Sequence, residues 1–166
     1  MPVRRIASIT AAVFVLLPAL LQARIGESFD ECTERYGRHV RLSDDGKVHV
    51  FESGRFRIFI EFNGDSAEEV IYRKIPPGRD YVSKPVQLAT SEIHSLLKSN
   101  FGEGEWDVAH PDLYTIAYSD PQGGWNASYS TLTGNLILLT RAAADRLAAA
   151  KQEADDNMDA AGLEGL

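Results

Sequence analysis

The same sequence pattern occurs twice in this chain: an amphipathic helix followed by strands. The most regular of the predicted strands covers residues 55–62. Two sets of side chains alternate along this stretch: Phe56, Ile58, Ile60 and Phe62 in one set, and Arg55, Arg57, Phe59 and Glu61 in the other. Because successive side chains of a strand point to opposite faces, the alternation predicts one buried and one open face. The buried face requires a covering layer, which limits the chain to folds that pack helices on a sheet.

The first copy of the succession begins with a predicted capping box. The Ser28 hydroxyl can accept from the amide of Glu31, whose carboxylate can reach back to the amide of Ser28. Four residues at helical spacing follow, and Gly37 favours a helix end: Phe29, Cys32, Thr33 and Tyr36. The predicted strands of this copy are residues 47–52, 55–62 and 69–74.

The second copy begins at Thr90 or Ser91. Its apolar stripe consists of Ile93, Leu96, Leu97 and Phe101. Gly102 ends this helix as Gly37 ends the first, and aligning the two glycines, 65 residues apart, places Cys32 on Leu97. The predicted strands that follow are residues 113–118, 125–130 and 135–140.

We therefore predict an α+β fold in which two helix-plus-three-strand repeats form one antiparallel sheet with both helices on one face. One such repeat is too small to bury an adequate core, and joining two solves that problem. The expected domain covers residues 24–140, divided into repeat one at 25–75, a linker at 76–89 and repeat two at 90–140. Residues 141–166 are expected to form an Ala-rich helix that ends in a disordered acidic tail from about Asp155.

Residues 1–23 have the order of a signal peptide, with Arg4 and Arg5 first, an apolar run next and Ala23 last. The apolar run is shorter than the roughly 20 residues that a spanning helix needs, so we expect a cleaved leader and not a membrane anchor. Once the leader is removed, we expect no stable membrane span. A retained anchor is the alternative. The predicted location is secreted or periplasmic.

Charge and composition exclude several classes of function. Without the leader, 15 basic and 24 acidic residues remain, a formal charge of −9. This charge disfavours nucleic acid and suits a basic partner. No zinc spacing, phosphate loop or nucleophile motif is present, so no catalytic residue, metal ligand or cofactor is predicted. Cys32, the only cysteine, is expected to be buried and unreactive. The four histidines are expected to be ordinary loop or surface residues: His39, His49, His94 and His110.

The predicted interaction surface lies on the open face of the sheet. Its candidate residues are Arg55, Arg57, Phe59 and Glu61, to which Trp106 is added as either an exposed anchor or a lid over the sheet end. A mixed row of charged and aromatic side chains is typical of protein interfaces. An ordinary solvated sheet face is the competing interpretation.

The start of the first helix resembles a signature of the superfamily that contains the β-lactamase inhibitor protein and the small lipoprotein of the outer-membrane β-barrel assembly machine (SmpA/OmlA-like). The matching residues are Gly26, Ser28, Glu31 and Gly37, with Tyr36 in place of the family's leucine and His39 in place of its proline. The resemblance implies a non-catalytic binding module of helix-plus-hairpin repeats. It also extends to exported bacterial proteins of this size.

These observations predict an exported binding module whose partner is a protein or a cell-envelope component. The first alternative is an exported hydrolase with carboxylates assembled by the fold, which a deep polar pocket would favour. The second is a small-molecule carrier, which a closed apolar cavity would favour.

Overall fold

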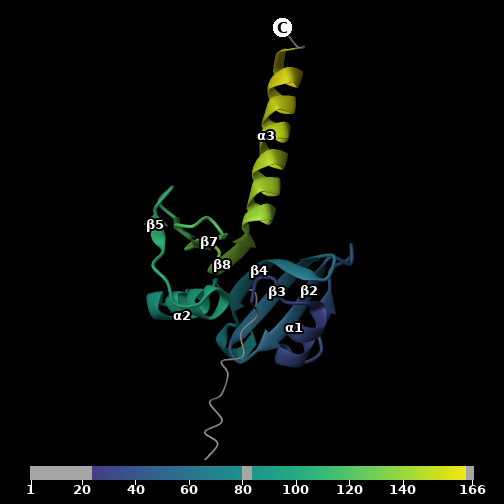
Figure 1. Cartoon of the computed structure of the whole chain (residues 1–166), viewed down its shortest axis with the longest axis vertical. Helices are drawn as coiled ribbons and strands as arrows, with labels where there is room; N and C mark the ends of the chain where they lie inside the picture. The colour runs from purple at the N-terminus through teal and green to yellow at the C-terminus, as the bar shows by residue number, and fades with distance from the viewer. Residues whose placement is uncertain (1–23, 80–83, 164–166) are drawn as a thin grey trace, which may run out of the picture.

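The structure is a computed structural model that describes residues 24–79 and 84–163 (Figure 1). The predicted signal peptide, residues 1–23, and the middle of the predicted linker lie outside the described residues. Among the described residues, eight strands form one antiparallel sheet in the order β1-β2-β3-β4-β8-β7-β6-β5. The four strands after the first helix therefore form one half of the sheet, and the four strands after the second helix form the other half. The two halves meet at the centre, where β4 pairs with β8.

We call α1 to β4 the first unit and α2 to β8 the second unit. The first unit comprises α1 (Phe29–Tyr36), β1 (Arg41–Leu42), β2 (Val48–Ser53), β3 (Phe56–Asn63) and β4 (Ser66–Lys74). The second comprises α2 (Thr90–Phe101), β5 (Asp107–Ala109), β6 (Thr115–Ser119), β7 (Trp125–Ser130) and β8 (Asn135–Thr140). A short 3₁₀ turn, Pro77–Arg79, follows the first unit, and α3 (Arg141–Leu163) follows the second.

The predicted fold class is confirmed: the structure is α+β, with an antiparallel sheet and a C-terminal helix. Each unit also has one short strand that was not predicted, β1 in the first and β5 in the second, so four strands follow each helix. These strands have two and three residues, which is too short to produce a recognisable alternation. They occupy the two edges of the sheet, where pairing on one side alone holds them.

The predicted helix ends agree well with the structure. In α1, the Glu31 amide donates to the Ser28 hydroxyl, and the Ser28 amide donates to Glu31 Oε2 at 2.8 Å. In α2 the cap residue is Ala89, one residue before the predicted start, and only the Glu92 half of the box is formed, by the Ala89 amide at 2.8 Å. The helices end at Gly37 and Gly102, at φ 81° and 87°.

The core lies between the sheet and the two helices α1 and α2. Each central strand contributes alternate residues to it, and both helices contribute one face. The fully enclosed large side chains are Phe51, Ile58, Ile60, Val70, Tyr72, Leu97, Leu136 and Leu138. Cys32 has no exposed surface, which confirms its predicted burial, and this burial raises the pKa of its thiol to about 12.

Helix α3 packs on the sheet through its first turns and projects away from it beyond them (Figure 1). Ala143 is its buried residue near the sheet, whereas Leu147 and Met158 are 53% and 68% exposed. The tail that we expected to be disordered from Asp155 is helical as far as Leu163. No helix within residues 24–79 and 84–163 is both long enough and apolar enough to cross a bilayer.

Candidate binding surfaces

An apolar stripe crosses the face of the sheet that α1 and α2 do not cover. The strand register places Phe59 opposite Val50 and Ile71, and Ile71 opposite Ile137. Val50 is 6% exposed, and the other three are half-buried. The stripe, defined as these four residues, is continuous over β2, β3, β4 and β8. It runs across both units because β4 pairs with β8.

Basic residues border the stripe on one side. Arg57 lies opposite Arg73, and each has a fixed partner on the same face. Arg57 forms an ion pair with Glu52 on β2 at 2.5 Å. The guanidinium of Arg73 lies 5.3 Å from the centre of the Phe59 ring and donates to Asn135 Oδ1 at 2.8 Å. These contacts hold the Arg73 guanidinium over an aromatic ring and the Arg57 guanidinium against Glu52, and a planar guanidinium is suited to recognising carboxylates.

Acidic residues border the stripe on its other side. Glu61 lies directly opposite Glu69. Burial raises the pKa of Glu69, and the neighbouring Glu61 raises it further. A cavity of about 540 Å³ lies between this pair and the first turns of α3, where Ala143 and Leu147 form part of the lining. The Arg146 side chain forms an ion pair with Glu68 at the edge of this cavity.

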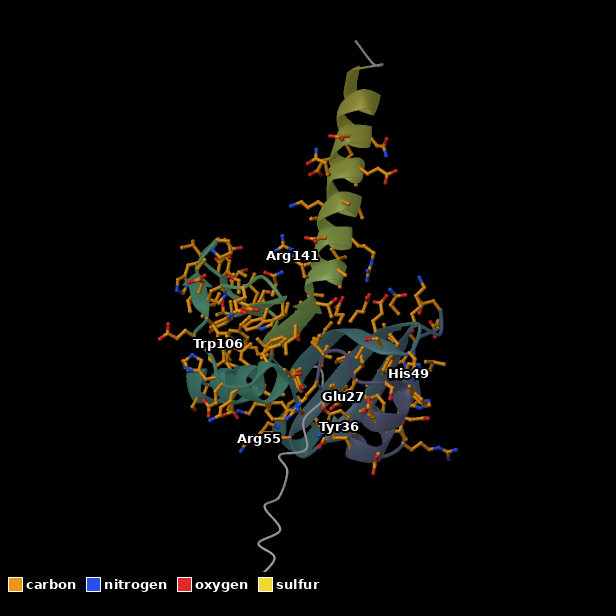
Figure 2. The ribbon with its side chains drawn as sticks, in the orientation of Figure 1. Glu27, Tyr36, His49, Arg55, Trp106 and Arg141 are labelled. Atoms are coloured by element: carbon orange, nitrogen blue, oxygen red, sulfur yellow. The ribbon has the colours of Figure 1, made fainter. Side chains whose placement is uncertain are left out.

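The structure brings together three of the four predicted open-face residues, Arg57, Phe59 and Glu61. Arg55 does not join them, which corrects the prediction. It precedes β3, in the turn after Gly54, and its guanidinium forms an ion pair with Glu92 at the start of α2 at 3.1 Å (Figure 2). The alternation of faces applies only to residues that belong to the strand. Arg55 lies in the turn before β3, and the turn directs its side chain toward the face covered by the helices.

Trp106 packs at the edge of the second unit. Its ring lies 6.4 Å from that of Trp125 and 5.9 Å from that of His94, centre to centre. Trp125 in turn stacks on Phe101, with the rings 3.7 Å apart and nearly parallel. Trp106 is half-buried against the core, so of its two predicted roles the structure supports the lid over the sheet end.

A cleft lies beside these rings, and we call it the aromatic cleft. Its volume is about 500 Å³. The α2–β5 loop forms one side and the β6–β7 turn the other, and the lining residues are Phe101, Glu103, Gly104, Glu105, Trp106, Asp120, Pro121, Gln122 and Trp125. Only Trp106 of this set could be predicted as a candidate from the sequence, since the loop and the turn are adjacent only after β6 and β7 have paired.

Two histidines that were expected to be ordinary loop or surface residues lie against each other. The rings of His39 and His49 are 5.1 Å apart, and Phe29 of α1 lies 4.7 Å from His49. His49 is half-buried, and its Nδ1 is enclosed with no hydrogen-bond partner among the described residues. Burial lowers the pKa of His49, and His39 lowers it further. Within residues 24–79 and 84–163, no three His, Cys, Asp or Glu residues are grouped to hold a metal ion.

No protein-family model and no curated protein matches this chain. One similar solved structure is that of a DUF4309 family protein, YjgB, from Bacillus subtilis subsp. subtilis str. 168. The two chains are 11% identical, the match covers 68% of this chain and 78% of that one, and the TM-score is 0.39. A similarity at this level supports no inference about function.

Proposed function

We propose that this chain is an exported, non-catalytic binding module that uses the open face of its sheet to bind another protein. The observation that carries the proposal is the apolar stripe, which lies between a basic and an acidic border. Protein interfaces commonly have an apolar centre and a polar rim. Charged borders of opposite sign would fix the direction in which a partner lies across the stripe.

The location and the ancestry of the module are part of the same proposal. The leader pattern of residues 1–23 supports export, and the shared plan of the two units supports a tandem repeat. The residues that resemble the SmpA/OmlA-like signature have a structural role here. Gly26 donates to the Ala67 carbonyl at 2.8 Å, and Ala67 donates to the Glu27 carbonyl at 2.9 Å, which ties the start of α1 to β4.

Site-specific photo-cross-linking in the exporting host tests the binding surface. A photoreactive side chain at Phe59 should capture one partner protein, whereas the same group at Leu113, which is 90% exposed in the second unit, should not. The captured protein, once purified, should bind the wild-type chain directly. Equal capture at both positions would mean that the open face is an ordinary solvated surface.

A charge-reversal pair then tests the role of the basic border. Arg73→Glu should weaken binding of the captured partner at least about fivefold, because it replaces a guanidinium group of the basic border by a carboxylate beside Arg57. Arg38→Glu, an exposed change after α1, should leave the affinity unchanged. Equal affinities for the two variants would contradict the proposal.

Intact-mass measurement of protein recovered from the exporting host tests the proposed location. Removal of the leader should leave a chain that begins near Arg24. A chain that retains residues 1–23 would be an anchored protein instead.

A specific observation also supports the hydrolase alternative. Glu61 and Glu69 face a cavity of about 540 Å³, and the raised pKa of Glu69 beside a second carboxylate is the pattern of a general acid paired with an ionised partner. A hydrolase of this kind would lose nearly all its activity in the Glu69→Gln variant, whereas a binding module would keep its affinity for the captured protein. The carrier alternative calls for a closed apolar cavity, whereas the cavities described above are open to solvent and have charged linings.

A further inference from the structure

The aromatic cleft combines a hollow surface with a wall of stacked rings. Phe101 and Trp125 stack face to face, and Trp106 meets Trp125 at an interplanar angle of 65°, so rings of two orientations form the wall. The cleft volume of about 500 Å³ lies within the range of small-molecule sites. Trp125 is fixed by β-sheet pairing with Thr140 of β8 and Phe101 by α2, which makes this wall rigid.

The charged side chains that line the cleft are all acidic. Its lining contains three carboxylates, those of Glu103, Glu105 and Asp120, and no Lys, Arg or His among the described residues. Glu103 forms an ion pair with Lys98 of α2, which offsets its charge. Asp120 accepts from the amides of Gln122 and Gly124, both at 3.0 Å, so its carboxylate is held in place by the turn.

A wall of tryptophan rings together with carboxylates is chemically complementary to an organic cation. The face of an aromatic ring carries negative potential and attracts ammonium and guanidinium groups, and tryptophan is the strongest of the aromatic residues in this respect. A carboxylate fixed nearby adds attraction without having to reorganise. We propose that the aromatic cleft binds an organic cation, an ammonium or guanidinium group carried on a short apolar body.

This site is separate from the proposed function of the open face. Its aromatic wall belongs to the core side of the second unit, whereas the apolar stripe lies on the opposite face of the sheet. Loss of partner binding through Phe59 would leave the cleft unaffected. Cation binding can therefore fail or succeed independently of the proposed interface.

The chain contains its own probe for this site, because its two tryptophans, Trp106 and Trp125, both line the cleft. Choline added to the full mature chain at pH 8 should change the tryptophan fluorescence saturably and shift both indole N–H resonances. The neutral isostere 3,3-dimethyl-1-butanol should do so at least about fivefold more weakly, and 0.5 M sodium chloride should weaken the choline response, since screening reduces ionic attraction. An equal response to the isostere would overturn the proposal in favour of an apolar cleft. A response to methyl glucoside but not to choline would identify a sugar site instead.

Two matched variants test whether the carboxylates of the cleft contribute to choline binding. Glu105→Gln removes one carboxylate of the cleft and should weaken choline binding about twofold to fivefold, the range expected for loss of one exposed ion pair. Glu34→Gln makes the same change at an exposed position of α1 and should have no effect. Unchanged binding in both variants, or no saturable response to choline in the wild-type chain by either method, would overturn the proposal.

Discussion

The two units share one backbone plan but fill it differently. In the first, α1 has 8 residues and buries only Cys32, whereas in the second, α2 has 12 residues and buries Ile93, Leu96, Leu97 and Asn100. Both helices precede four strands, and both end at a glycine whose amide donates to the carbonyl four residues earlier. The plan therefore depends on helix ends and strand pairing, and the amount of apolar packing varies within it.

The first unit uses aromatic rings where the second uses a longer helix. Phe29 contacts His39, His49 and Phe62, with ring centres between 4.7 and 5.9 Å apart. These residues come from α1, from the loop after it, and from β2 and β3. A short helix covers a small area, and rings from the strands fill the space that it leaves.

Hydrogen bonds also connect the two units. Asn100 of α2 donates to the hydroxyl of Tyr72, on β4 of the first unit, at 3.1 Å. Arg24, ahead of α1, donates to the carbonyl of Ser99 at 3.1 Å. Together with the β4–β8 pairing, these contacts make a common core, and we expect the units to unfold as one.

The largest difference between the units should appear at the pair of aligned buried helix residues. Leu97→Ala should reduce the free energy of unfolding by about 2–5 kcal/mol, because it leaves a cavity in a fully enclosed site. Cys32→Ala removes a single sulfur atom and should cost about 1 kcal/mol. Urea denaturation of both variants measures the two values. Equal losses would show that α1 contributes as much packing as α2.

The glycines that end the two helices should behave alike. Gly37 and Gly102 have φ of 81° and 87° with ψ near 180°, and a Cβ at either would meet nothing within 4 Å. Substitution by Ala should therefore cost only backbone strain, about 1–3 kcal/mol at each position. Thermal denaturation of the two variants gives the comparison, and a clear inequality would show that the helix ends are not equivalent.

The loss of stability between pH 7 and pH 5 should originate at His49, in the first unit. The pKa of His49 in the folded chain lies below its ordinary value of 6.5, because of burial and of His39. The unfolded chain then binds more protons, so stability is complete above pH 6.5 and falls as the pH decreases toward the folded pKa. His49→Phe should flatten this decrease between pH 7 and pH 5. Urea denaturation of the wild-type chain and the variant at pH 7 and pH 5 measures the difference, and equal decreases in the two chains would contradict the assignment to His49.

The smallest effect is expected outside both units. Truncation after Asp155 removes a part of α3 that stands clear of the sheet, and should shift the melting temperature by no more than about 2 °C. Amide exchange in residues 142–154 should be much faster than in residues 56–62, because an isolated helix of this length is marginal in water. Slow exchange there would show that α3 has a partner in solution.

The open face could be predicted only in part from the sequence. Arg57, Phe59 and Glu61 follow from the alternation of β3, which is strict. Ile71 and Ile137 lie in uniformly apolar stretches of β4 and β8, where neighbouring residues on both faces are apolar and alternation assigns neither. Their place on the stripe follows from the register of the β4–β8 pairing.

The sequence by itself determined the features that depend on near neighbours along the chain. Helix ends at Gly37 and Gly102, the capping box at Ser28 and the buried side of β3 are all set by residues within one turn or one strand. Tertiary structure alone decided what gathers in space: Glu61 and Glu69 under α3, His39 against His49, and Trp106 across from Asp120. Such groups form where segments distant in sequence meet, and the order in which strands pair determines that meeting. Local propensity does not indicate which distant segment will lie against a given sheet edge, turn or helix end.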